Sequence, residues 1–144
     1  MSGLSPVRVG VDLVSVARVS RLMDSSAGRL LADHFTDRER AELEQVSNGR
    51  LETLSGRIAA KEAVIKVLAP EGEIIRWAEV EILGPAGRVP RAHLSGRAAR
   101  LAFERHLDAI EISISHEGPW AAAIAAGATG APGTARDHHN GGEA

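Results

Sequence analysis

One stretch of the chain concentrates side chains that could do chemistry: Arg57, Lys61, Glu62 and Lys66. Glu62 and Lys66 are four residues apart, so on a helix they can form an ion pair that stabilises it by about 0.2–0.5 kcal/mol. Alternatively, the basic side chains bind phosphates and the carboxylate binds a metal ion. The small residues between them, which would let a ligand or another element approach closely, are Ala59, Ala60 and Ala63.

A second candidate is Asp12, a charge inside the apolar run V-G-V-D-L-V and two residues after Gly10. An isolated ionised carboxylate costs several kcal/mol in an apolar site, or else takes up a proton. An arginine, a helix N-terminus or a divalent cation would each serve as its partner. Mg²⁺ typically takes one or two carboxylates together with waters and substrate phosphates.

A third candidate, His116, ends the segment S-I-S-H just before the turn Glu117-Gly118-Pro119. It is either an exposed turn residue or a hydrogen-bond donor or proton carrier beside a phosphate. A zinc-protease helix is excluded, because Trp120 stands where the second histidine should be and Pro119 would disrupt the helix. The sequence also contains no phosphate-binding glycine loop of the P-loop or Rossmann type.

Composition narrows the class of protein. The 144 residues suit one domain, and 44% hydrophobic residues with a net charge of −2 suit a packed core. Two Trp, two Phe and no Tyr leave few rings for stacking on bases, so we expect no nucleic-acid partner. Without a signal peptide, a long apolar run or any cysteine, we expect no membrane partner and a cytoplasmic location.

Periodicity and turn signals predict the elements that position these residues. Ser15 and Ser95 are predicted helix N-caps, and Thr36 with Glu39 forms a capping box. The predicted helices span residues 16–23, 37–45, 51–68 and 96–106, and the predicted strands span residues 7–14, 74–83, 89–94, 110–116 and 120–126.

This order of elements predicts an α+β fold, a small largely antiparallel sheet with a long central helix. We expect one domain over residues 1–127. Residues 128–144 are rich in Gly, Ala, Thr, Pro, His and Asn and are predicted to be a disordered tail. The pair His138-His139 belongs to that tail and is not counted as a metal site.

The segments V-G-V-D-L-V-S-V-A-R-V, F-T-D-R-E, G-R-I-A-A-K-E-A-V-I-K and I-S-I-S-H, followed by W-A-A-A-I-A, occur in that order. Together they resemble the holo-acyl-carrier-protein synthase family of 4'-phosphopantetheinyl transferases. The resemblance covers Val7 to about Ala126, and G-R-I-A-A-K-E-A is its most specific part. It implies the fold of that family.

The resemblance implies a Mg²⁺-dependent enzyme that moves 4'-phosphopantetheine from coenzyme A to a serine of an apo acyl carrier protein and releases adenosine 3',5'-bisphosphate. It implies a role in fatty acid biosynthesis and lipid metabolism, although the carrier could equally serve polyketide or peptide assembly. Short members of the family are homotrimers with sites between neighbouring subunits, so we expect a homotrimer.

By the same resemblance, Asp12 and Glu62 are the metal ligands, and Glu62, Lys66 and His116 are the catalytic residues. The positions that match coenzyme A contacts are Arg57, Lys61, Lys66 and His116. The group that removes the serine proton stays open among Glu62, His116 and a metal-associated water. The chemistry needs charge stabilisation on phosphoryl oxygens and no cysteine nucleophile.

Arg18, Arg21 and Arg29 lie on or just after the first predicted helix, where family members contact the acidic recognition helix of the carrier. Complementary charge of this kind raises the association rate and selects the partner. The alternative is a solvated basic face.

Two departures from the family pattern leave alternatives open. The loop of residues 69–73, Ala-Pro-Glu-Gly-Glu, replaces a Gly-Thr-Gly loop beside the coenzyme, and the Gly-Lys-x-Pro turn survives only as Gly87-Arg88-Val89-Pro90. One alternative is therefore a non-catalytic carrier-binding module on the same scaffold. Another is a different Mg²⁺-dependent nucleotide phosphotransferase.

Overall fold

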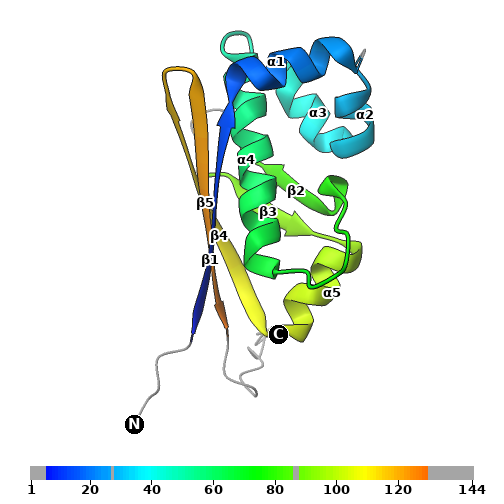
Figure 1. The fold of residues 1–144 in the computed structure, drawn as a ribbon, viewed down its shortest axis with the longest axis vertical. Helices are drawn as coiled ribbons and strands as arrows, with labels where there is room; N and C mark the ends of the chain where they lie inside the picture. Colours follow the sequence, from blue (N-terminus) through cyan, green and yellow to red (C-terminus); the bar gives the residue numbers. More distant parts are fainter. Residues whose placement is uncertain (1–5, 27, 86–87, 130–144) are drawn as a thin grey trace, which may run out of the picture.

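A long helix lying along an antiparallel sheet organises the molecule (Figure 1). The computed structural model describes residues 6–26, 28–85 and 88–129. Its elements, in order, are β1 (Val7–Ser15), α1 (Val16–Ser25), α2 (Arg29–His34), α3 (Asp37–Glu44), α4 (Arg50–Leu68), the 3₁₀ helix η1 (Trp77–Glu79), β2 (Val80–Leu83), β3 (Arg91–Leu94), α5 (Gly96–Glu104), β4 (Leu107–Glu117) and β5 (Trp120–Thr129).

The sheet has five strands in the order β1-β5-β4-β3-β2, and every neighbouring pair is antiparallel. Strand β1 pairs with β5 from Val7↔Ala128 to Ser15↔Trp120, so the first and last strands of the described chain lie side by side. This arrangement confirms the predicted α+β fold. Strand β5 continues through Thr129, two residues into the predicted tail, and residues 130–144 lie outside the described residues.

Small residues allow α4 to lie close to the sheet. Ala59, Ala60 and Ala63 of the helix are fully buried, and they belong to one core with Ala123 and Ala125 of β5. A Cβ added at Gly10 of β1 would stand 2.0 Å from the carbonyl oxygen of Ala63, so only glycine permits this approach. The backbone of β1 is therefore in direct contact with α4.

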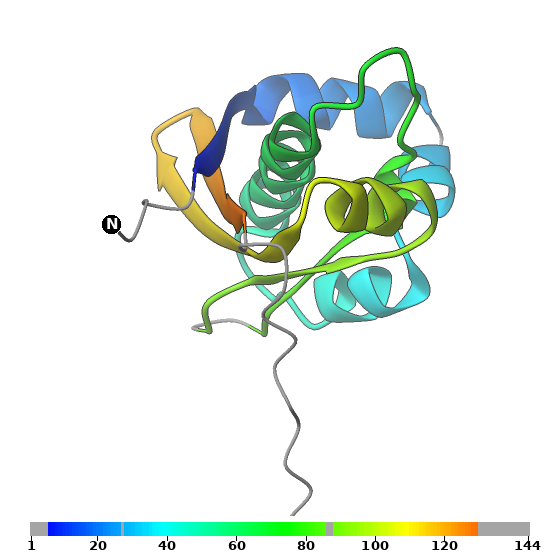
Figure 2. The same ribbon diagram turned by 90° about the horizontal axis from the view of Figure 1, so that it is seen from below.

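A second cluster of buried residues lies under the helices α1 to α3, and α4 contributes to it from its first half. Its members are Val19, Phe35, Leu43, Leu54 and Ile58. The helix α4 is thus buried on both sides, against the sheet and against the three shorter helices (Figures 1 and 2).

The face of β1 and β5 turned away from α4 is apolar and exposed. Alternate residues of β1 point there, and each is about 60% exposed: Val7, Val9, Val11 and Leu13. Trp120 and Ile124 of β5 are each 47% exposed on the same face. Figure 2 shows the described helices gathered on the opposite side of these strands.

Most predicted elements are confirmed, and three details are corrected. Residues 74–79 do not continue a strand, because Glu79 accepts a hydrogen bond from the Arg76 N–H and bends the chain into η1. Helix α2 was not predicted. Ser95 makes no side-chain cap bond to α5; the Glu79 carboxylate accepts from the Arg97 N–H there instead.

Candidate active site

Asp12, Arg18 and Glu62 meet at one cavity of about 340 Å³ formed by β1, α1 and α4. Two of these side chains are acidic and come from segments fifty residues apart. The apolar wall of the cavity consists of Leu13, Val14, Val19, Leu22, Ile58 and Trp77. The cavity therefore has one polar end with two carboxylates and one apolar end.

Strand alternation turns Asp12 toward α4, because it lies on the same face of β1 as Gly10 and Val14. Its carboxylate is 20% exposed and accepts a hydrogen bond from Lys66 Nζ at 3.0 Å. Lys66 Nζ also donates to the Val11 carbonyl at 2.6 Å. This contact supplies the cationic partner that the buried charge of Asp12 requires.

The Glu62–Lys66 pair considered from the sequence is not the pair that forms. Among the ion pairs of the described residues, Lys66 binds Asp12 across to β1 and not Glu62 on its own helix. Glu62 is half-buried and faces the same cavity. Asp12 thus has two relations: it lines one cavity with Glu62, and it pairs with the Lys66 ammonium.

Two carboxylates on one cavity suit a hard divalent cation such as Mg²⁺, which prefers oxygen ligands and takes the remainder from water and phosphate. Within residues 6–26, 28–85 and 88–129, no three His, Asp or Glu side chains lie close enough to bind a metal ion by themselves. The donor set therefore fits a metal that shares its ligands with a bound substrate rather than a closed structural metal site.

Arg57 lies on another side of α4. Its side chain is 6% exposed and donates to Glu42 Oε2 at 2.6 Å, to the Gly84 carbonyl at 3.0 Å and to the Ile82 carbonyl. It lines a second cavity of about 360 Å³ together with Glu42, Gln45, Val46, Asn48, Thr53, Gly84 and Pro85. The guanidinium therefore forms part of a cavity wall rather than extending into solvent.

Lys61 is fully enclosed. Its ammonium lies 2.8 Å from Glu39 Oε1, donates to the carbonyls of Trp77 and Val80 at 2.9 and 2.7 Å, and lies 4.7 Å from the centre of the Phe35 ring. Burial lowers the pKa of Lys61, and the Glu39 carboxylate opposes that decrease. All three ammonium protons are used inside the protein, and the Lys61 side chain is 0% exposed. A contact of Lys61 with coenzyme A stays a prediction.

Glu39 has a second role besides the helix cap that the sequence predicts, because it also binds Lys61. The capping box with Thr36 is present, as predicted. The partnership with Lys61, twenty-two residues further on, was missed. The available signal was the presence of two acidic residues in F-T-D-R-E and of one lysine on the buried side of a helix.

His116 lies on β4, separated from β1 by β5, on the sheet face that contacts α4. Its Nε2 donates to the Glu52 carbonyl at 2.8 Å, and its ring packs on Gly56, where an added Cβ would come within 2.8 Å of Nε2. His116 is absent from the described lining of the Asp12–Glu62 cavity. A single chain therefore does not bring His116 to the two carboxylates.

The three arginines predicted to dock a partner are exposed. Arg18 and Arg21 lie on α1, and Arg29 begins α2, where its Nε donates to the Ser26 carbonyl at 3.3 Å. Arg18 also lines the Asp12–Glu62 cavity. The basic surface of α1 and α2 is thus continuous with the rim of the cavity at Arg18.

A third cavity, of about 460 Å³, was not predicted from the sequence. It lies along β2 and β3, shares Glu42, Gly84 and Pro85 with the Arg57 cavity, and has four basic groups in its lining. These groups are Arg38, Arg88, Arg91 and His93.

The loop of residues 69–73, which differs from the family's Gly-Thr-Gly loop, is bound to α5 and to Arg105 directly after it. Ala69 ends the helix with φ of 42°, and Arg105 donates to its carbonyl at 2.5 Å. Arg100 pairs with Glu73 at 2.5 Å. The acid at position 73 is therefore neutralised by α5, and it does not line the Asp12–Glu62 cavity.

The family model described as "4'-phosphopantetheinyl transferase superfamily" matches residues 8–125. The chain is 40% identical over 117 residues to the holo-[acyl-carrier-protein] synthase of Desulforudis audaxviator, covering 81% of this chain and 88% of that protein. It is 36% identical over 120 residues to the synthase of Verminephrobacter eiseniae, covering 83% and 91%.

Solved structures give the same result. The structure described as a Chronobacterium ammoniagenes ACPS–CoA complex superposes with a TM-score of 0.71 at 30% identity, covering 88% of this chain and 99% of that one. A holo-ACP-synthase from Plasmodium yoelii superposes with a TM-score of 0.75 at 24% identity, covering 90% and 100%, which supports the fold alone.

Proposed function

The chain belongs to the 4'-phosphopantetheinyl transferase superfamily, and from that premise we propose that it transfers 4'-phosphopantetheine from coenzyme A to a serine hydroxyl of an apo acyl carrier protein. It is an enzyme of the transferase class, as its similarity to holo-[acyl-carrier-protein] synthases indicates. The serine oxygen forms a bond to the phosphorus of the phosphopantetheine group. The bond from that phosphorus to the bridging oxygen breaks, and adenosine 3',5'-bisphosphate departs.

The observation that carries the proposal is that Asp12 and Glu62 line one cavity, while the Lys66 ammonium binds Asp12 at 3.0 Å. Asp12 and Glu62 are the proposed ligands of Mg²⁺, which when bound would stabilise negative charge on the phosphoryl oxygens. Lys66 is 50% exposed, so its ammonium can turn from Asp12 toward a phosphoryl oxygen of the substrate.

Among the candidates for the serine proton, Glu62 is better placed than His116 within one chain. Glu62 lines the cavity, whereas His116 donates its Nε2 proton to a backbone carbonyl and lies elsewhere. We therefore assign the proton to a carboxylate oxygen of Glu62. His116 stays a proposed coenzyme contact that would require a neighbouring subunit.

The adenosine end of the coenzyme is proposed to lie in the two cavities beside β2 and β3 of a neighbouring subunit, because these cavities share no lining residue with the Asp12–Glu62 cavity. Arg57 lines one and Arg38, Arg88 and Arg91 line the other, and guanidinium groups suit phosphates. The carrier is proposed to dock on Arg18, Arg21 and Arg29, because its recognition helix is acidic and these side chains are exposed. No described helix is long and apolar enough to cross a membrane.

A homotrimer is proposed as well, supported by the exposed apolar face of β1 and β5. Large contiguous apolar surfaces of this kind usually mark interaction sites. We also propose a cytoplasmic location, which agrees with coenzyme A and a carrier protein as substrates. A role in fatty acid biosynthesis is proposed as well.

The decisive experiment incubates the protein with coenzyme A, Mg²⁺ and an apo carrier protein and measures the mass of the carrier. We expect an increase of one phosphopantetheine group and release of adenosine 3',5'-bisphosphate. Asp12→Ala and Glu62→Ala should each lower the rate by about a hundredfold or more. The matched control is Asp108→Ala, an exposed carboxylate at the start of β4.

Three results would contradict the proposal. Unchanged mass across several carriers would refute the reaction, and heat on titration with carrier but none with coenzyme A would point to a binding module. Wild-type rates in Asp12→Ala or Glu62→Ala would show that the two carboxylates are not the site.

A further inference from the structure

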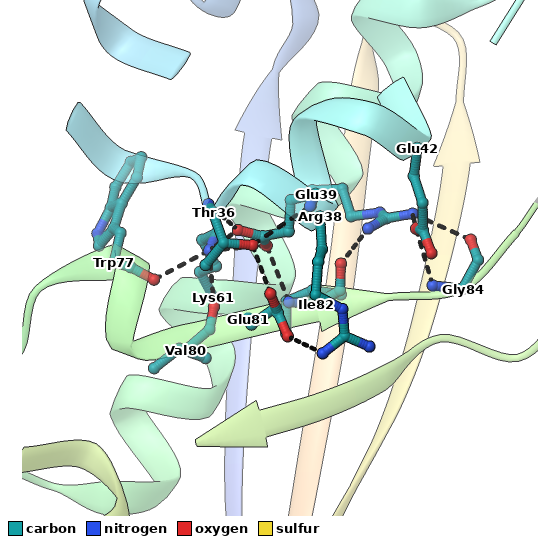
Figure 3. A network of polar contacts seen from close by, with 11 residues as sticks. Thr36, Arg38, Glu39, Glu42, Lys61, Trp77, Val80, Glu81, Ile82 and Gly84 are labelled. Atoms are coloured by element: carbon teal, nitrogen blue, oxygen red, sulfur yellow. Dashed lines mark hydrogen bonds and ion pairs between the residues drawn. The ribbon is translucent and has the colours of Figure 1, made fainter. Parts of the chain in front are cut away.

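The ion pair between Glu39 and Lys61 lies inside the protein, and both side chains are 0% exposed (Figure 3). Glu39 Oε1 also accepts from the Ile82 N–H at 2.8 Å, and Oε2 from the Thr36 N–H at 2.9 Å. Each oxygen and each ammonium proton therefore has a partner.

These partners belong to four different elements. Thr36 is the N-cap of α3, Lys61 belongs to α4, Trp77 begins η1, and Val80 and Ile82 belong to β2. The pair thus connects the main chain of three elements to one side chain of α4. A rotation of α4 about its axis would break several of these bonds at once.

Stability alone gives little reason for such a pair. Replacing a buried ion pair by uncharged residues of similar volume is often neutral or stabilising, because desolvation of the two charges offsets their attraction. What the pair does provide is a defined orientation, since its bonds form in only one arrangement of the elements.

Two features connect the pair to the Asp12–Glu62 cavity. Glu62 directly follows Lys61, and successive helical residues point about 100° apart, so the direction of Lys61 determines that of Glu62. Trp77 lines the cavity, and its own carbonyl accepts from Lys61. The ammonium is therefore bonded to one wall residue and covalently adjacent to another.

We infer that Glu39 and Lys61 are positioning residues, which orient Glu62 toward Asp12 and keep Trp77 at the wall of the cavity. Neither side chain touches the substrate. Their hydrogen bonds fix the rotation of α4 about its axis and the position of η1. The inference rests on the proposed function for the use of the cavity as a metal site.

The test replaces both charges at once, in the double variant Glu39→Gln/Lys61→Met. The amide oxygen at position 39 can still accept from the Ile82 N–H, and neither variant residue leaves a buried charge. Binding of Mn²⁺, used as the probe, is measured by the electron paramagnetic resonance signal of the free ion. The indole N–H resonance of Trp77 is followed by NMR and assigned with Trp120→Phe.

We expect the double variant to fold with a melting temperature near that of the wild type, while the Mn²⁺ dissociation constant rises at least fivefold and the Trp77 resonance shifts. In the transfer reaction, kcat should fall while KM for the carrier stays unchanged, because the docking arginines are untouched.

The control is Arg100→Met/Glu104→Gln, which removes an ion pair on α5 whose residues neither line the Asp12–Glu62 cavity nor adjoin a lining residue. Its Mn²⁺ affinity should equal that of the wild type. Equal weakening in both double variants, or wild-type Mn²⁺ binding in Glu39→Gln/Lys61→Met, would overturn the inference.

If that double variant does not fold, Glu39→Asp makes the same comparison, since it keeps both charges and shortens the reach to Ile82 and Lys61. Weakened Mn²⁺ binding in this folded variant supports the inference, and wild-type binding overturns it. A wild type that binds Mn²⁺ but modifies no carrier would refute the proposed function and leave the positioning role intact.

Discussion

Glu79 shows how a single carboxylate can cap two helices. It accepts from the Arg76 N–H at 3.0 Å, within η1, and from the Arg97 N–H at 3.3 Å, at the start of α5. Its Oε1 lies 2.4 Å from where a Cβ of Gly96 would be, and Gly96 has a φ of +51°. Burial raises the pKa of Glu79, but the two backbone hydrogen bonds and the charge of Arg76 outweigh it, so the pKa is lowered overall.

A pH dependence follows from this lowered pKa. A carboxyl whose pKa is lower in the folded state stabilises the fold above its unfolded value, 4.5, and that contribution disappears as the pH falls through the folded pKa. We expect Glu79→Gln to lower the free energy of unfolding by about 1 kcal/mol at pH 7. The deficit should shrink toward zero below pH 4.5, measured by urea denaturation across this range.

The matched control is Ser95→Ala at the N-cap of the same helix α5. Since Ser95 makes no side-chain cap bond, its loss should change the free energy of unfolding by less than about 0.5 kcal/mol. A larger loss in Ser95→Ala than in Glu79→Gln would show that the serine caps α5 after all. A deficit of Glu79→Gln that persists at acidic pH would show that the charge of Glu79 is not its cause.

Caps formed between near neighbours could be predicted, whereas this one could not. Ser15 and the Thr36–Glu39 box act over three residues, so the sequence contains both partners in one motif. Glu79 reaches Arg97 only because β2 and β3 bring η1 to the start of α5. The same limit applies to the Lys61 ion pair, which joins residues of two separate helices.

At the scale of elements, the contact of α4 with β1 determines where Asp12 and Lys66 meet. Gly10 would place a Cβ 2.0 Å from the Ala63 carbonyl and 2.9 Å from Lys66 Cβ. The obstacle at 2.0 Å is helix backbone, which cannot move aside as a side chain can. The strand and the helix would have to separate to accommodate any larger residue.

We therefore expect Gly10→Ala to lower the free energy of unfolding by about 1–3 kcal/mol and to slow the transfer reaction. Thermal denaturation and carrier mass measurements check both effects. Gly127→Ala is the control, because its Cβ would meet only side-chain atoms, of Leu107 at 3.0 Å and Val67 at 3.1 Å, which can adjust. Equal effects of the two variants would contradict the role given to the Gly10 contact.

Elements with a clear period were predictable from sequence, and the exceptions have physical causes. Strand alternation identified β1, β4 and β5, and helical spacing identified α4. Residues 74–79 alternate like a strand, but 74–76 are irregular and Trp77–Glu79 form η1, because Lys61 binds the Trp77 carbonyl and Glu79 bends back to Arg76. Helix α2 spans only six residues, which is too short for a periodic signal.

The helical spacing of the basic and acidic residues of α4 also predicts that they lie on two different sides of the helix. Arg57 and Lys61 are four residues apart, as are Glu62 and Lys66, so each pair shares a side of α4 and the two pairs diverge. The structure follows this division. Arg57 and Lys61 bind acidic residues of α3, whereas Glu62 and Lys66 face Asp12.

At the scale of the whole molecule, the exposed apolar face of β1 and β5 is the surface most in need of a partner. Val11 is 61% exposed and pairs across the strands with Ile124, at 47%. We expect the wild type to elute as a homotrimer and Val11→Asp to dissociate toward monomers, because burying an unpaired carboxylate is costly. Light scattering coupled to gel filtration measures the mass.

The control for this prediction is Phe103→Asp, on α5. Phe103 is 82% exposed but lies outside the sheet face, so its substitution should leave the oligomeric state unchanged. A monomeric wild type, or equal dissociation in both variants, would exclude the sheet face as the subunit interface.

The pairing of β1 with β5 also has a consequence for synthesis on the ribosome. Strand β1 is made first among the described elements, yet its only strand neighbour in the described sheet, β5, is made last. The N-terminal strand therefore has to remain unpaired while every intervening helix emerges. Until translation has passed Thr129, Asp12 lacks its final surroundings, so nascent chains are expected to be inactive. The unpaired apolar strand β1 must be protected from aggregation during this time.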